Sequence, residues 1–326
     1  MQCITHPDSK KAMSYTRNQI LGRFDVLAIP ARMDVDNAWA EYARPQDNTL
    51  FFVHHVAALD IGSQHATDIS DYRCGQGQPE FFQAKYIRDM HSIFRTTLAA
   101  QRFSGVEHAV WFPLGMGAFL RDLPRHDPVY QVAETMAELR RLIARAFFEA
   151  VVVELGTSSG IKVHLCLAEG PAGSEADENC LAFLTALQES LPAGYANDVT
   201  VWLNTDAAAL AQHLANTSAT PLAVSLTNGA NRSLIGNHWF VDGANTAIDE
   251  NLHRRSLSLA LMAFLANGVK VRNAGKTWDS RIRTSEWIQS LGGKHYHVDD
   301  AQTPLMVFAS SALAPSPSHG PSRPSM

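Results

Sequence analysis

Short apolar runs alternate with longer amphipathic stretches through the middle of the chain. The short runs are rich in branched and aromatic side chains, a pattern that predicts buried strands. We expect strands at Phe24–Ile29, Leu50–Ala57, His108–Phe112, Lys162–Leu167, Val199–Leu203 and Leu222–Leu226. The longer stretches show a helical period. We expect helices at Glu80–Ala100, Pro128–Ala150, Asn179–Leu191, Ala207–Ala215 and Thr246–Asn267.

Strands that alternate with helices favour an α/β fold, in which a mixed, mostly parallel sheet is flanked by helices on both faces. We interpret residues 21–308 as one such domain with insertions. Residues 1–20 are polar and aperiodic and predict a flexible leader, and the Pro- and Ser-rich residues 309–326 predict a disordered tail. Ligands of such sheets bind beyond the carboxyl ends of the strands, so a site is expected in the loops that follow them.

Composition narrows the classes of function. Hydrophobic residues make up 46% of the chain and charged residues 18%, as in an ordinary folded, water-soluble protein. A net charge of -5 without a basic stripe disfavours nucleic-acid binding. No apolar run reaches the roughly 18 residues of a membrane span. We therefore expect neither nucleic-acid nor membrane partners, and a cytoplasmic protein or one delivered into a host cell without a cleaved signal peptide.

Cysteine and histidine spacing does not indicate a metal site. None of the four cysteines lies in a CxxC pair, and we expect reduced thiols, with Cys166 buried in a strand. The 14 histidines include the adjacent His54 and His55, but neighbours on a strand point to opposite faces. No HExxH spacing occurs either. The sequence therefore predicts no metal ion and no cofactor.

Two loops combine a strand end, glycines and a following helix. The first is Pro113–Phe119 (PLGMGAF), and the second runs from Thr227 to Glu250. Glycines let backbone N–H groups approach phosphate oxygens closely, and a helix N-terminus adds a favourable dipole. Each loop taken alone is equally typical of a tight turn. Two of them on one sheet favour a phosphate-binding site.

Four segments resemble the macrodomain family, whose members bind ADP-ribose. The segment Val224–His253 (VSLTNGANRSLIGNHWFVDGANTAIDENLH) resembles the first ligand loop of the family, and Val110–Pro124 (VWFPLGMGAFLRDLP) resembles its phosphate loop. The segment Val199–Leu210 (VTVWLNTDAAAL) resembles the opening strand of the family with its following turn, and Leu50–Asp60 (LFFVHHVAALD) resembles another of its strands. The ligand loops stand in the reverse of the usual order, as a circular permutation would produce. This arrangement is similar to that of bacterial effectors that hydrolyse ADP-ribosylated ubiquitin.

The resemblance implies roles for particular residues of these loops. It implies ligand binding by Asp206, Asn228, Gly115, Met116, Gly117, Ala118, Phe119, Gly236 and Trp239. It implies catalytic roles at the scissile bond for Asp242, Asn231, Asp249 and Glu250. Each residue also has a plain structural interpretation, as a turn residue, a helix cap, a core aromatic or a solvated helix acid.

Because the chain departs from the family pattern, the sequence does not decide which carboxylate is catalytic. Asp242 matches the family aspartate that activates the attacking water, and Asn231 matches the asparagine that binds the distal ribose. Where the family often has three glycines, this chain has Gly236–Phe240 (GNHWF). The pair Asp249-Glu250 is similar to the paired acids of poly-ADP-ribose glycohydrolases, but its spacing from Gly236 differs from theirs.

The resemblance implies hydrolysis at the anomeric carbon of the distal ribose, through an oxocarbenium-like transition state that a carboxylate stabilises. An acidic cluster would suit an arginine-linked substrate, because carboxylates hold a guanidinium in a bidentate fashion. Ubiquitin is a candidate protein partner. Two alternatives stay open: a module that binds ADP-ribose without cleaving it, and a nucleotide-sugar or dinucleotide enzyme. The acids disfavour the first, and the lack of a GxGxxG motif after an early strand disfavours the second.

Overall fold

The computed structural model describes residues 24–33, 49–62, 68–73, 81–156, 160–195, 198–230, 236, 248–256, 258–259 and 263, together with the backbone of five short strands outside these ranges. One of those strands, β1 (Gln2–Ile4), lies within the expected leader and pairs with the main sheet. The other four form two hairpins, β8 (Val271–Asn273) with β9 (Lys276–Trp278), and β10 (Lys294–Val298) with β11 (Thr303–Val307).

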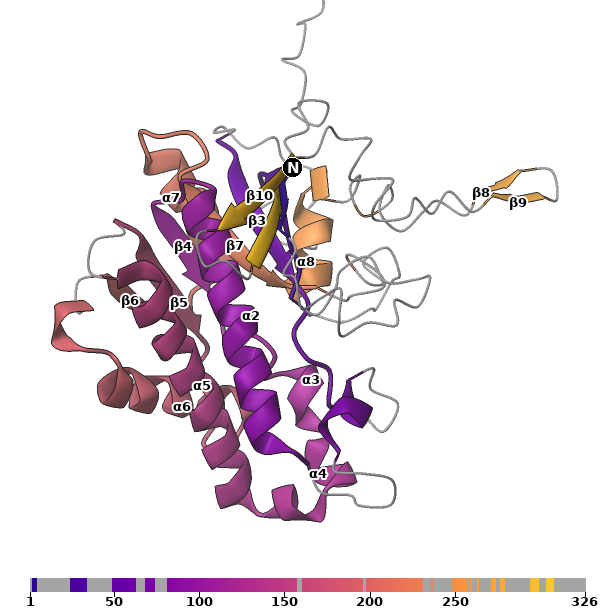
Figure 1. Ribbon diagram of the computed structural model, residues 1–326, viewed down its shortest axis with the longest axis vertical. Helices are drawn as coiled ribbons and strands as arrows, with labels where there is room; N and C mark the ends of the chain where they lie inside the picture. The colour runs from indigo at the N-terminus through magenta and orange to yellow at the C-terminus, as the bar shows by residue number, and fades with distance from the viewer. Residues whose placement is uncertain are drawn as a thin grey trace, which may run out of the picture.

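A mixed, mostly parallel sheet forms the centre of the protein (Figure 1). Its strands lie in the order β2 (Val26–Ala31), β3 (Phe51–Val56), β7 (Val224–Gly229), β4 (His108–Trp111), β5 (Lys162–Leu167) and β6 (Val199–Leu203), with β1 on the outer edge of β2. From β3 to β6 all neighbours are parallel, whereas β2 is antiparallel to β3 and β1 to β2. β7 is the last of these strands along the chain, yet it lies between β3 and β4.

Helices cover both faces of the sheet, which confirms the expected layers (Figure 1). One face carries α2 (Gln83–Phe103), α5 (Ala133–Leu155) and α6 (Glu175–Ser190), and the other carries α7 (Ala207–Thr217) and α8 (Ile248–Arg255). Shorter turns are α3 (Ala118–Arg121), α4 (Leu123–His126) and the 3-10 turns η1 (Ile69–Tyr72), η2 (Pro128–Gln131) and η4 (Ala193–Tyr195). Among the described residues, no helix is long and apolar enough to cross a membrane.

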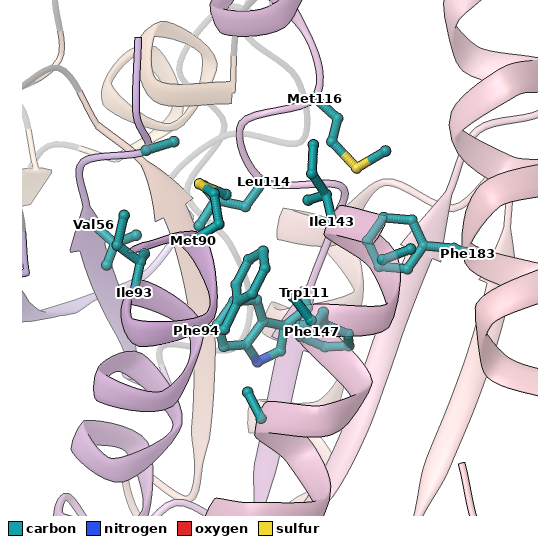
Figure 2. Packing of buried hydrophobic residues seen from close by; sticks show 14 of the residues in the cluster. Val56, Met90, Ile93, Phe94, Trp111, Leu114, Met116, Ile143, Phe147 and Phe183 are labelled. Carbon is teal, nitrogen blue, oxygen red and sulfur yellow. The ribbon is translucent and has the colours of Figure 1, made fainter. Parts of the chain in front are cut away.

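The larger hydrophobic core fills the space between the sheet and α2, α5 and α6. Its centre is aromatic: the ring of Trp111 lies 6.2 Å from that of Phe94 and 5.1 Å from that of Phe147 (Figure 2). All three side chains are buried, and aromatic pairs at such distances add to the stabilisation that burial gives. This packing fixes β4 against two long helices, so the loop that follows β4 starts from a rigid strand end.

Several expected elements are confirmed, and their boundaries show what local sequence determines. β5 and β6 begin and end at the expected residues, and Cys166 is buried in β5, where burial raises the pKa of its thiol to about 12. The helix expected from Pro128 begins instead at Ala133. Pro128–Gln131 form a separate 3-10 turn, because the Asp127 side chain accepts a hydrogen bond from Val129 N (3.0 Å) and caps it.

The strand expected at Leu222–Leu226 is displaced toward the C-terminus. Leu222 has a left-handed φ of 60° and belongs to a turn, so β7 begins at Val224. The strand then continues to Gly229. Asn228, expected in the loop, therefore lies within β7 opposite His55 of β3, and its side chain is buried.

A hydrogen-bonded row of aromatic side chains crosses β6, β5 and β4. Trp202 Nε1 donates to His164 Nδ1 (3.1 Å), and His164 Nε2 lies 2.9 Å from His108 Nδ1. An indole N–H can only donate, so a neutral His164 accepts at Nδ1 and donates from Nε2 to His108. Burial, with a smaller effect of His108, lowers the pKa of His164 to about 4. The folded row therefore requires an uncharged His164.

We expect this row to make the protein less stable as the pH falls from 7 toward 4. An unfolded histidine takes up a proton near pH 6.5, whereas folded His164 does so only near pH 4, so acid favours the unfolded state. Shielded fully from solvent, His164 would lower the free energy of unfolding by about 2 kcal/mol between pH 7 and pH 5. Its partner His108 is only half-buried, so solvent screening reduces this loss to about 1 kcal/mol. Urea unfolding at pH 7 and pH 5 tests this. Between these pH values, the free energy of unfolding of His164→Phe should fall by about 1 kcal/mol less than that of the unaltered protein. Equal losses in the two proteins would contradict this account.

Candidate functional site

Three adjacent parallel strands bring the predicted motifs to one edge of the sheet. β3, β7 and β4 lie side by side, and their carboxyl ends meet there. The loops that follow are tied together: Ala230 N donates to Val56 O (2.8 Å), and Ile61 N donates to Phe119 O (3.0 Å). Segments far apart in the sequence therefore form one continuous surface at the place where α/β sheets bind ligands.

The glycine loop after β4 carries free backbone donors. Met116 N donates to Pro113 O (3.3 Å) and closes a turn, within which Gly115 has a left-handed φ of +79° that favours glycine. In the described part of the chain, the N–H groups of Gly115, Gly117 and Ala118 donate to no acceptor. Gly117 is half-buried and Ala118 is exposed. Neighbouring free amides of this kind suit an anion.

Buried side chains hold the glycine loop from below. Leu114 and Met116 alternate with the glycines and are buried, and Figure 2 shows both among the residues of the larger core. Arg140 of α5 is also buried, and its Nη1 donates to Met116 O (2.9 Å) and to Asn179 Oδ1. Its Nε lies 3.0 Å from Glu178 Oε2. The carbonyl side of the loop is thus fixed to α5 and α6 by an arginine that is itself paired with Glu178.

Gly62, in the loop after β3, makes the closest backbone approach to the glycine loop. A Cβ at this position would lie 2.3 Å from Ala118 O and 2.9 Å from Phe119 C. Real Cβ atoms essentially never come closer than 3.0 Å, so only glycine fits here without moving the neighbouring backbone. The two loops therefore constrain each other's position.

Phe119 and Asp206 both have structural roles. Phe119 is half-buried and packs against the larger core, in agreement with the core interpretation. The Asp206 carboxylate caps α7 by accepting from Ala209 N (2.8 Å), and Arg255 Nη1 lies 2.9 and 2.8 Å from its two oxygens. The capping interpretation is therefore confirmed. Asp206 follows β6, two strands from β4, and its side chain is 52% exposed, which leaves room for a ligand.

Asp249, in the first turn of α8, is the centre of a buried network. Its Oδ1 accepts from Asn228 Nδ2 (2.8 Å) and its Oδ2 from Gly236 N (3.0 Å). Asn228 Nδ2 also lies 2.9 Å from His55 Nδ1. Burial acts to raise the pKa of Asp249, but His253, His55 and the bond from Asn228 together hold it below its ordinary value. The ionised carboxylate thus joins α8, β7 and the turn at Gly236.

The interpretation of Asp249 and Glu250 as solvated helix acids is wrong. Their exposed fractions are 3% and 1%. Both lie in the first turn of α8, where the helix dipole favours negative charge, and the bond from Asn228 places Asp249 beside β7. Two buried acids therefore lie in the first turn of α8. Asn231, Trp239 and Asp242, the other predicted residues of that loop, lie outside the described residues.

Comparison with known protein families and with curated proteins finds no match for this chain. Its site must therefore be interpreted from its own residues, including some that the sequence reasoning missed. Arg140 interrupts the apolar face of α5 between Met136 and Ile143, a pattern from which a buried, paired arginine could have been predicted. Gly62 and His253 had no such signal, because their contacts lie far away along the chain.

Proposed function

We propose that this protein binds ADP-ribose at the carboxyl ends of β3, β7 and β4, and that it removes ADP-ribose from modified proteins by hydrolysis. The observation that carries the proposal is the set of free amides at Gly115, Gly117 and Ala118, on a turn anchored in the core. A diphosphate needs several donors at fixed spacing, and backbone amides supply them without an exposed cation. Arg140 holds the inner side of the same turn in place through its bond to Met116 O.

The sheet order supports an extended arrangement of the ligand. Asp206 follows β6, the glycine loop follows β4, and the acids of α8 lie beside β7. The distance from β6 to β7 is three strand spacings, about 14 Å in all. Adenine near Asp206, diphosphate over Gly115–Ala118 and distal ribose toward Asp249 and Glu250 would occupy this edge in sequence.

The acids support cleavage in addition to binding. In the reaction, the bond between the anomeric carbon of the distal ribose and the protein side chain breaks, water supplies a hydroxyl group to that carbon, and its proton passes to the leaving group. Negative charge stabilises the oxocarbenium-like transition state. Both oxygens of Asp249 already accept hydrogen bonds, so we assign it a positioning role. Glu250 and Asp242 are then the candidates that act on water.

The substrate class follows from the same charges. A buried acidic pair suits a cationic leaving group, so we propose arginine-linked ADP-ribose, and ADP-ribosylated ubiquitin is one candidate protein partner. A module that binds ADP-ribose without cleaving it is the second candidate function. The free amides support both functions equally, and only turnover separates them.

Calorimetric titration with ADP-ribose, followed by incubation with arginine-ADP-ribosylated protein, tests the proposal. We expect binding by the unaltered protein, by Asp242→Ala and by Glu250→Gln, with release of ADP-ribose lowered at least about 100-fold in the variant that lacks the catalytic acid. Glu134→Gln, at an exposed position of α5, is the control and should behave as the unaltered protein.

Each outcome assigns a different function. Binding with release supports the hydrolase. Binding without release by the unaltered protein supports the non-catalytic module. No heat of binding would reject the assignment of Gly115–Ala118 as a phosphate loop.

A further inference from the structure

Three potential metal ligands converge where α8 packs on β3. His55 comes from β3, and Asp249 and His253 lie one turn apart on α8. Each side chain offers one ligand atom, and the three atoms lie within 4.8 Å of one another. Their exposed fractions are 0%, 3% and 1%. Buried clusters of two imidazoles and one carboxylate are uncommon unless they are paired or bind a metal ion.

The hydrogen bonds of this cluster leave buried polar atoms without partners. Among the described residues, no group bonds to His55 Nε2, to His253 Nε2 or to Asn228 Oδ1. Each such atom costs about 1–3 kcal/mol relative to a satisfied one. Asn228 Nδ2 can only donate, so His55 accepts at Nδ1 in this arrangement, and a metal ion that binds His55 would replace that hydrogen bond. The unpartnered atoms show that the buried cluster can accommodate a further ligand.

The tautomer of His253 fits metal coordination. Its Nδ1 lies 2.7 Å from the backbone oxygen of Asp249, which can only accept, so Nδ1 carries the proton. The lone pair of a neutral His253 is then at Nε2, the atom without a partner. Metal-binding histidines almost always donate their second ring N–H to a carbonyl or carboxylate in this way. This tautomer therefore leaves a lone pair on His253 that a metal ion can use.

Ligand type and distance also suit an ion. The cluster combines two imidazole rings with one carboxylate, all three buried, and so offers nitrogen and oxygen ligands together. Two metal bonds of about 2.1 Å span at most about 4.2 Å. Atoms within 4.8 Å would close on an ion through side-chain shifts of less than about 1 Å.

We propose that His55, Asp249 and His253 form a site for a divalent transition-metal ion, with Zn²⁺ as the first candidate. Two nitrogens and one oxygen suit Zn²⁺, Co²⁺ or Fe²⁺ better than Mg²⁺ or Ca²⁺, which prefer oxygen ligands. The ion joins α8 to the sheet and thereby fixes the helix that carries Glu250. The metal site shares Asp249 with the proposed hydrolase site, but its tests do not use ADP-ribose. It departs from the sequence-based expectation, which was that the chain holds no metal ion.

Cobalt spectroscopy tests the site directly. Protein stripped with a chelator is titrated with Co²⁺ and then with Zn²⁺. We expect visible d–d bands of a low-coordinate cobalt ion that Zn²⁺ abolishes. His253→Ala and His55→Ala should bind one ion fewer than the unaltered protein, or bind that ion at least about 100-fold more weakly, since even loss of an outer partner costs 10- to 100-fold.

His54→Ala is the matched control. His54 is the neighbour of His55 in the same strand and is equally buried, but it points to the opposite face, with Phe52 and Val56. This variant should keep the ion. Loss of binding in all three variants, or in none, would overturn the proposal.

X-ray absorption of the unaltered protein loaded with Zn²⁺ covers the case in which a variant fails to fold. Its spectrum should show scattering from two imidazole rings. A single ring, or sulfur ligands, would reject the assignment. Neither experiment depends on ADP-ribose, so failure of the metal site and failure of the proposed hydrolase are distinguishable.

Discussion

Replacing Gly62 with alanine should weaken ADP-ribose binding at least about tenfold, although Gly62 belongs to neither ligand loop. The added methyl group would lie 2.3 Å from Ala118 O and 2.9 Å from Phe119 C, both backbone atoms that cannot rotate away. The glycine loop must therefore shift by roughly 0.7 Å or more to restore contact at 3.0 Å. Tenfold corresponds to about 1.4 kcal/mol, within the usual cost of overpacking.

Titration calorimetry with ADP-ribose, together with urea unfolding, measures this effect. Gly194→Ala is the control, because a Cβ there meets nothing within 4 Å and η4 lies away from the loops. We expect Gly194→Ala to bind as the unaltered protein does. Unchanged affinity in Gly62→Ala would mean that the position of Ala118 does not control binding, and would count against the phosphate loop.

Replacing Asp249 with alanine should lower the free energy of unfolding by about 3–5 kcal/mol in metal-free protein. The substitution leaves Gly236 N without its acceptor, and Asn228 Nδ2 keeps only His55 Nδ1 of its two partners. A buried donor that loses its partner costs about 1–3 kcal/mol, and loss of one member of a buried charged network costs about 3–5 kcal/mol.

Urea unfolding in the presence of a chelator measures this loss without a contribution from bound metal. Asp177→Ala is the matched control, since its half-buried carboxylate accepts a hydrogen bond from Gly173 N (2.9 Å), a bond that contributes about 1 kcal/mol. If the two variants lose equal stability, the buried network at Asp249 is weaker than its hydrogen bonds indicate.

Much of the fold could be predicted from sequence, because the strands and helices have clear periods. β5 and β6 match their expected residues, and both helical layers are present. The errors have local causes that periodicity does not detect. Asp127 caps a separate 3-10 turn at Pro128–Gln131, so α5 begins later than expected. The left-handed Leu222 shifts the start of β7. No pattern in the sequence reveals which strands become neighbours.

The candidate site was predictable only in part. The glycines at 115 and 117 and the acids at 249 and 250 stand in recognisable motifs, so sequence reasoning selected them. Their surroundings were not predictable. Burial of Asp249 depends on β7 meeting α8, and the pairing of His55 with His253 joins residues almost two hundred positions apart. Long-range packing, which no local pattern encodes, decides whether an acid or a histidine is solvated.

The central position of β7 determines the order in which a newly made chain can fold. β2 and β3 form one part of the sheet and β4, β5 and β6 another, and only β7 joins them. The ribosome needs roughly 6–23 s to add the residues between Trp111 and Val224. During that time β3 has an unpaired edge, and β4 has one too after β5 and β6 have been made; such edges promote aggregation. Synthesis of β7 closes the sheet and brings Asn228 beside His55 in one step, so a chain that ends before Val224 forms two half-sheets, with no site between them.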